Sequence, residues 1–305
     1  MPTDFDRLPI TGWYPGHMLR AGRQMREILA LVDLVVELLD ARIPRTSRNP
    51  ALGRVFGAKP RCLVFNKSDL ADPAMTRAWS EGLRAEGRPA LFVDSLSGRG
   101  MDRLVPEWHR LIRAGRGEGG GRLGGLRPLR IMIAGIPNVG KSTLVNRLAE
   151  RKRAQVGPMP GVTRHQQWIP LAGNVELLDT PGVLWPRFSD KRTELKLALT
   201  GAIKDELVGE ELTAEYLWDW AAGHPGRLDF SAYRLDTCPA AAAELLDAVG
   251  RRRGLRRPGG AIDTRLSAQT LLREFRDGRL GRVTLDEPPE QAGGEAKEGT
   301  RTSKA

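Results

Sequence analysis

The sequence has no long hydrophobic run and few cysteines. No stretch of its 305 residues approaches the roughly 18 apolar residues that a membrane-spanning helix needs, so we expect no membrane partner. The two cysteines, Cys62 and Cys238, support neither a disulfide framework nor a zinc module. The first residues do not combine a charged start with an apolar stretch, so we expect no secretory signal. Together these absences favour a cytoplasmic protein.

Lysine is also scarce, yet the chain is strongly basic. Lysine and arginine together number 48 against 37 acidic residues, which gives a net charge of +11. The excess is concentrated between Arg251 and Arg282, where arginines far outnumber Asp263, Glu274 and Asp277. This clustering favours a polyanionic partner, although an arginine-rich solvated surface would have the same composition.

Apolar patterning predicts two regions of different class. Short buried strands are predicted at 34–39, 61–65, 90–93, 129–134 and 175–178, with helices near 18–32 and 75–86. This alternation predicts an α/β domain with a mainly parallel sheet and flanking helices. Helical patterns follow at 193–208, 210–222, 240–249 and 263–277, without further strands. We therefore expect a small all-α domain at the C-terminal end.

These patterns also suggest domain boundaries. The α/β domain is expected over residues 1–190 and the helical domain over 191–285. A glycine-rich segment at 115–127 predicts a flexible linker within the first domain. Residues 286–305 have no apolar periodicity and are expected to form a disordered tail.

A phosphate-binding loop follows the strand predicted at 129–134. The string from Gly135 to Ser142 fits G-x-x-x-x-G-K-[ST] between a strand and a helix. Backbone N–H groups at such a helix N-terminus surround a β-phosphate. Lys141 is expected to neutralise the β- and γ-phosphates in catalysis, and Ser142 to bind Mg²⁺. The nucleotide-binding residues expected here are Asn138, Val139, Gly140, Lys141, Ser142 and Thr143.

A second string indicates which base is bound. Asn66-Lys-Ser-Asp69 follows the strand predicted at 61–65. In an N-K-x-D loop the aspartate accepts hydrogen bonds from N1–H and the exocyclic amine of guanine, a donor pair that adenine lacks. Asn66 is expected to contact the base edge, and the aliphatic stem of Lys67 to lie against the ring. The sequence therefore predicts GTP and GDP as ligands.

Two further strings supply candidate switch residues. Asp179-Thr-Pro-Gly182 follows the strand predicted at 175–178. Asp179 is expected to hold Mg²⁺ through water, and the N–H of Gly182 to sense the γ-phosphate. Thr163 is the candidate for a threonine that closes over Mg²⁺ when GTP is bound. The similar string that begins at Asp247 lies in a predicted helix and is interpreted as a chance match.

The order of the motifs indicates a circular permutation, because N-K-x-D precedes the phosphate loop instead of following it. Three more strings accompany these motifs: Trp13-Tyr-Pro-Gly-His-Met18, Asp40-Ala-Arg-Ile-Pro44, and a C-terminal stretch at 260–282. On these residues the chain resembles the circularly permuted GTPases of ribosome assembly, most closely the ribosome biogenesis GTPase A family of the YlqF type. The resemblance covers about residues 13–285.

The resemblance implies a cytoplasmic GTPase that binds the maturing large ribosomal subunit and helps to complete it. It also implies that Ser95 contacts guanine, although Leu96 stands where the family has a small residue. No glutamine that could orient water follows Gly182, and the resemblance favours His17 for that role; helix capping is the alternative. His165 is a weaker catalytic candidate.

The helix predicted at 263–277 has a basic side. Arg265, Arg273 and Arg276 fall beside an apolar face on a helical wheel, which predicts contact with folded RNA.

Asn138 suggests K⁺ as a second cofactor, with turn geometry as the alternative. We expect a monomer. Two other functions stay open: a GTPase linked to another RNA, and an RNA-binding scaffold in which hydrolysis is incidental.

Overall fold

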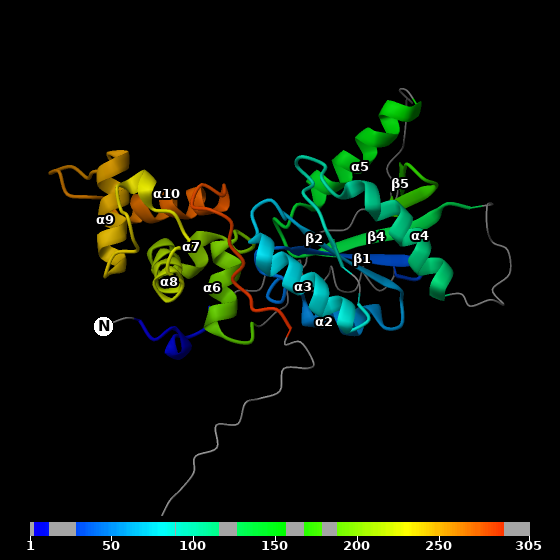
Figure 1. Cartoon of the computed structure of the whole chain (residues 1–305), viewed down its shortest axis with the longest axis horizontal. Helices are drawn as coiled ribbons and strands as arrows, with labels where there is room; N and C mark the ends of the chain where they lie inside the picture. Colours follow the sequence, from blue (N-terminus) through cyan, green and yellow to red (C-terminus); the bar gives the residue numbers. More distant parts are fainter. Residues whose placement is uncertain are drawn as a thin grey trace, which may run out of the picture.

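The structure is a computed structural model that describes residues 3–11, 29–88, 90–115, 127–156, 168–178 and 188–289. An α/β region and a bundle of helices lie side by side in it (Figure 1). Among the described helices, none is long and apolar enough to cross a membrane.

The α/β region is built on one sheet. Within the described ranges this sheet has six strands in the order β3-β2-β1-β4-β6-β5. The strands are β1 (Leu34–Asp40), β2 (Arg61–Asn66), β3 (Ala90–Phe92), β4 (Leu129–Gly135), β5 (Trp168–Leu171) and β6 (Val175–Leu178). Neighbours pair in parallel, except that β5 runs antiparallel to β6 at the edge. The prediction of a mainly parallel sheet is confirmed.

Helices cover both faces of the sheet, which is why its central strands are almost wholly apolar. On one face α2 (Pro50–Phe56) and α3 (Pro73–Ala85) pack against alternate residues of β1 such as Leu39. On the other face α4 (Leu104–Gly115) and α5 (Lys141–Val156) pack against Val36 and its neighbours. Every residue of β1 is buried.

The bundle contains the helices α6 (Lys191–Leu199), α7 (Asp205–Val208), α8 (Glu210–Gly223), α9 (Ala242–Arg253) and α10 (Thr264–Arg276). α10 packs between α8 and α9 and buries its predicted apolar face, which includes Leu271 and Phe275. The helix predicted over 193–208 is divided into α6 and α7, because the chain turns at Gly201 with φ +81°. Asp247 lies in α9, as expected.

Two segments depart from the predicted domain boundaries. The first is residues 3–11, which pack on the bundle although they precede the α/β region in the sequence. The ring of Phe5 in the 3₁₀ turn η1 (Phe5–Arg7) meets the ring of Tyr216 edge to face at 5.3 Å, and Arg192 pairs with Asp6 at 2.9 Å. Residues 3–11, which were expected to belong to the first domain of 1–190, therefore pack with the helical region.

The second segment is residues 281–289, here called the strap. The N–H of Val283 donates to the carbonyl of Leu70 at 2.9 Å, and that of Leu285 to the carbonyl of Arg42 at 2.7 Å. Asp286 is only 3% exposed. The expectation of a disordered tail beginning at residue 286 is therefore wrong for 286–289. The segment has no periodicity because it is neither a helix nor a strand. Single contacts hold it, from the loop residues Arg45 and Thr46 and from the side chains of Trp79 in α3 and Lys196 in α6.

Candidate functional site

Three loops meet where β1, β2 and β4 end. These strands are adjacent and parallel, so their carboxyl ends share one edge of the sheet, the usual place for a ligand in such a fold. β2 ends at Asn66, and Lys67 begins the loop that follows it; the phosphate loop, residues 135–142, runs from the last residue of β4 into the start of α5. The permuted motifs therefore come together in space although their order in the chain is reversed.

Asn66 joins three of the predicted nucleotide-binding segments. Its side chain is 1% exposed, its Nδ2 donates to the carbonyl of Val139 at 2.9 Å, and its Oδ1 accepts from the N–H of Ser95 at 3.0 Å. Gly140 approaches this amide so closely that a Cβ there would lie 2.3 Å from Nδ2, and its φ is +98°. Only glycine fits this position.

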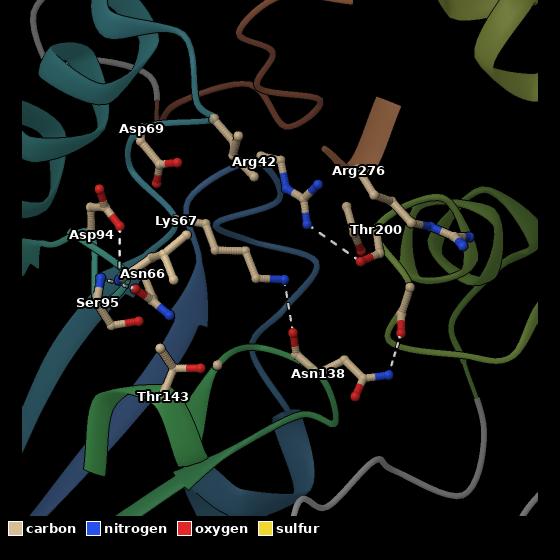
Figure 2. A pocket seen from close by; sticks show the side chains of 14 residues that line it. Arg42, Asn66, Lys67, Asp69, Asp94, Ser95, Asn138, Thr143, Thr200 and Arg276 are labelled. Atoms are coloured by element: carbon tan, nitrogen blue, oxygen red, sulfur yellow. Dashed lines mark hydrogen bonds between the residues drawn. The ribbon is translucent and has the colours of Figure 1, made fainter. Parts of the chain in front are cut away.

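Lys67 lies across the pocket floor in a left-handed conformation, with φ +59°. Its Nζ donates to the carbonyl of Asn138 at 2.8 Å (Figure 2). The same Nζ lies 3.3 Å from Oδ2 of Asp40. Burial lowers the pKa of Lys67, and the charge of Asp40 opposes that shift. The N-K-x-D loop is thus fixed directly to the phosphate loop.

The start of α5 provides the groups expected around phosphates. Nζ of Lys141 lies 3.4 Å from the carbonyl oxygen of Gly135 and 3.3 Å from that of Ile136, so it arches over its own loop. Ser142 and Thr143 occupy the first turn and are exposed, which leaves their hydroxyls accessible to a ligand. A helix N-terminus with these side chains suits a polyphosphate.

A pocket of about 450 Å³ opens beside these loops. Three of the predicted nucleotide-binding residues, Asp69, Ser95 and Thr143, line it, and Figure 2 shows them on elements of the α/β region. Its remaining wall comes from the helical bundle, at Thr200 and Gly201. A bound ligand would therefore touch both regions of the molecule.

The contacts between pocket and bundle run through the turn between α6 and α7, residues 200–204. The side-chain Nδ2 of Asn138 donates to the carbonyl of Gly201 at 2.7 Å (Figure 2). Nη2 of Arg42 donates to the carbonyl of Thr200 at 3.3 Å. No motif in the sequence marks this turn, since its residues lie within a predicted helix. The string that contains Arg42 carries the family resemblance but does not by itself indicate this contact.

The three arginines predicted for RNA contact do not share one surface. Arg276 turns toward the pocket wall, where Nη1 donates to Asp205 at 2.8 Å and Nη2 donates to the carbonyl of Ala198 at 2.8 Å. Arg265 pairs with Glu210 at 2.9 Å, while Arg273 is exposed. The expectation of one basic face is therefore not met by Arg276, because a helical wheel does not show which partners surround the helix.

Several predicted site residues lie outside the described residues: His17, Thr163, His165, Asp179 and Gly182. Among the residues that are described, no three His, Cys, Asp or Glu side chains form a group that could hold a metal ion. Of the predicted metal ligands, Ser142 lies among the described residues. In phosphoryl-transfer sites such a hydroxyl binds Mg²⁺ together with phosphate oxygens.

Comparisons with known proteins agree with this geometry. The family model of the 50S ribosome-binding GTPase matches residues 130–210. Ribosome biogenesis GTPase A of Priestia megaterium is 44% identical, with 91% of this chain and 97% of that protein covered. Mitochondrial ribosome-associated GTPase 1 of Mus musculus is 36% identical, with 91% and 90% covered. The crystal structure of GNP-bound YlqF from T. maritima is similar with a TM-score of 0.66 and 26% identity, covering 88% of this chain and 99% of that one.

Proposed function

The chain belongs to the ribosome biogenesis GTPase A family, and from this premise we propose that this GTPase acts late in the maturation of the large ribosomal subunit. The observation that supports this proposal is the shared wall of the nucleotide pocket. Asn138 of the phosphate loop bonds to the bundle at Gly201, so nucleotide occupancy can alter how the two regions contact each other. An assembly factor needs such a link between GTP and a docking surface.

Different residues around the pocket bind the guanine base and the phosphates. Asp69 pairs with the guanine edge, and Ser95 closes the same side. Lys141 and the N–H groups at the start of α5 hold the β- and γ-phosphates. Ser142 would hold Mg²⁺, because its hydroxyl is exposed in the first turn of α5, and the bound ion would supply positive charge that offsets the phosphates. Thr163 and Asp179 are the proposed additional Mg²⁺ ligands, and Gly182 the proposed γ-phosphate sensor.

His17 is the proposed catalytic residue, acting by orienting the attacking water. We expect His17→Ala to slow GTP hydrolysis on the ribosome while GTP affinity stays unchanged. Unchanged turnover on the ribosome would exclude this role. K⁺ is the second proposed cofactor, with Asn138 in the phosphate loop as its candidate ligand; hydrolysis rates that are equal in K⁺ and Na⁺ would exclude it.

The proposed RNA contact lies at the far end of the bundle. The turn between α9 and α10 projects away from the sheet (Figure 1) and carries Arg256, which is exposed. Arg252, near the end of α9, and Arg273, on the neighbouring helix α10, are also exposed. Arginine binds phosphate through a planar pair of donors, which suits folded RNA recognised by shape. Arg265 is a weaker candidate because Glu210 offsets its charge.

Binding to purified subunits tests this function. We expect the monomeric chain to co-sediment with large, and not small, ribosomal subunits, and to do so more strongly with a non-hydrolysable GTP analogue than with GDP. Equal binding to both subunits, or equal binding with the GTP analogue and with GDP, would favour the alternative of an RNA-binding scaffold.

The arginine surface has a matched control. The triple variant R252A/R256A/R273A should weaken binding to large subunits, because each side chain neutralises phosphate charge. The control R77A/R84A/R113A removes the same charge from exposed positions of α3 and α4 and should leave binding unchanged. Equal losses in both variants would show that net charge, and not this surface, determines binding.

A further inference from the structure

Three charged side chains are linked at the end of β1. Nε of Arg42 donates to Oδ1 of Asp40 at 3.0 Å, and Nη2 donates to Oδ2 at 2.8 Å. Nζ of Lys67 lies 3.3 Å from the same Oδ2. Asp40 and Arg42 are 2% and 1% exposed, so the carboxylate is held between two cations with almost no access to water.

Asp40 is ionised in this environment. Burial by itself would raise its pKa, but the charges of Arg42 and Lys67 and the hydrogen bonds from Arg42 outweigh burial and hold the pKa well below the usual range. Nη2 of Arg42 also donates to the carbonyl of Thr200, which restrains the guanidinium further. The carboxylate is therefore a permanent, immobile negative charge.

Lys67 and Arg42 of this group also line the nucleotide pocket, and Lys67 belongs to the same N-K-x-D loop as Asp69. A lysine side chain has four rotatable methylene groups and is mobile unless both ends are held. Here the left-handed backbone fixes one end, with φ +59°. Asp40 and the carbonyl of Asn138 fix the ammonium at the other end. The aliphatic stem between them is stretched along the pocket.

We propose that Asp40 is a positioning residue for guanine nucleotides, because it holds the Lys67 ammonium so that the lysine stem forms a fixed wall for the purine ring. Asp40 does not touch the nucleotide itself. It lies directly opposite Asn66 in the pairing of β1 with β2, which places it behind the N-K-x-D loop. The inference rests on the binding of guanine nucleotides by this pocket, and not on the proposed ribosomal role.

A double-mutant cycle on GDP release tests the proposal. Dissociation of a fluorescent GDP is measured for the parent chain, D40N, K67M and D40N/K67M. D40N should release GDP about tenfold faster, the size expected for the loss of one charge-assisted hydrogen bond. K67M keeps most of the stem but loses the ammonium, so D40N should add nothing in its presence. Multiplied effects in the double variant, or an unchanged rate in D40N, would overturn the proposal.

A second measurement separates positioning from a general loosening of the site. IDP lacks the exocyclic amine that Asp69 is expected to bind, so the ratio of GDP to IDP affinity reports on recognition of the base edge. D40N should weaken both nucleotides equally and leave this ratio unchanged, whereas D69A should reduce it. A changed ratio in D40N would contradict a role through the lysine stem.

A further variant tests whether misfolding of D40N, and not loss of positioning, explains faster GDP release. D40N leaves the Arg42 charge buried without its partner, which destabilises proteins strongly. D40N/R42M removes both buried charges and should release GDP as fast as D40N does. Slow GDP release by this folded double variant would overturn the proposal. No ribosome is present in any of these assays, so failure here and failure to bind large subunits are distinct results.

Discussion

Replacement of Asp286 by alanine should weaken the attachment of the strap to the α/β region. Its Oδ2 accepts from the backbone N–H groups of Arg45 at 2.9 Å and Thr46 at 2.7 Å. Its Oδ1 accepts from the hydroxyl of Thr46 and from Nζ of Lys196, each at 2.8 Å. Because the carboxylate is buried, its removal leaves the partly buried ammonium of Lys196 and two backbone donors without this partner. Breaking such a pair costs about 3–5 kcal/mol.

Urea unfolding, followed by tryptophan fluorescence, measures this loss. With a denaturant dependence of about 3 kcal/mol per molar urea, Asp286→Ala should lower the midpoint by about 1 M or more. The matched control is Asp277→Asn, whose carboxylate is half-exposed and lies 3.9 Å from Arg279, so it should change the midpoint little. Equal midpoints for the parent and Asp286→Ala would refute the idea that this carboxylate holds the strap.

Four other predictions have defined outcomes. Gly140→Ala places a Cβ 2.3 Å from Nδ2 of Asn66, so GDP binding measured by calorimetry should fall below detection. Asp69→Asn should weaken GTP binding and improve XTP binding, because xanthine reverses one hydrogen bond; unchanged preference would contradict the assigned base contact. The pKa of Asp40 is lower in the folded than in the unfolded chain, so its contribution to the free energy of unfolding should be complete above about pH 5 and decline as the pH falls below about 4. D40N should lack this component in an acid titration. Burial raises the pKa of the Cys62 thiol to about 12, so iodoacetamide at pH 8 should modify it only after unfolding.

The sequence was sufficient for the parts of the site that local motifs encode. Asn66, Asp69 and the phosphate loop come together because parallel strands end at one edge of the sheet, whatever their order in the chain. The prediction of a permuted P-loop GTPase is confirmed on this basis. The edge strand β5 was not predicted, since it has four residues and contains Pro170.

The remaining features depend on contacts between segments far apart in the chain. Arg276 was placed on a helical face, but only the packed bundle shows that Asp205 and the carbonyls of α6 surround it. The strap has no periodic pattern, because single hydrogen bonds to Leu70 and Arg42 hold it. The wall formed by Gly201 arises from a helix break that adjoins the phosphate loop only in the folded chain.

The most direct test of a ribosome-coupled GTPase is the rate of GTP hydrolysis by the purified chain, alone and with large ribosomal subunits, over a series of salt concentrations. Alone, turnover should be slow, near the unassisted Ras scale of about 10⁻⁴–10⁻³ s⁻¹. Large subunits should raise it many-fold, and the increase should disappear as salt screens the contacts with RNA phosphates. Turnover that large subunits do not raise at any salt concentration, or that small subunits raise equally, would contradict a role on the large subunit.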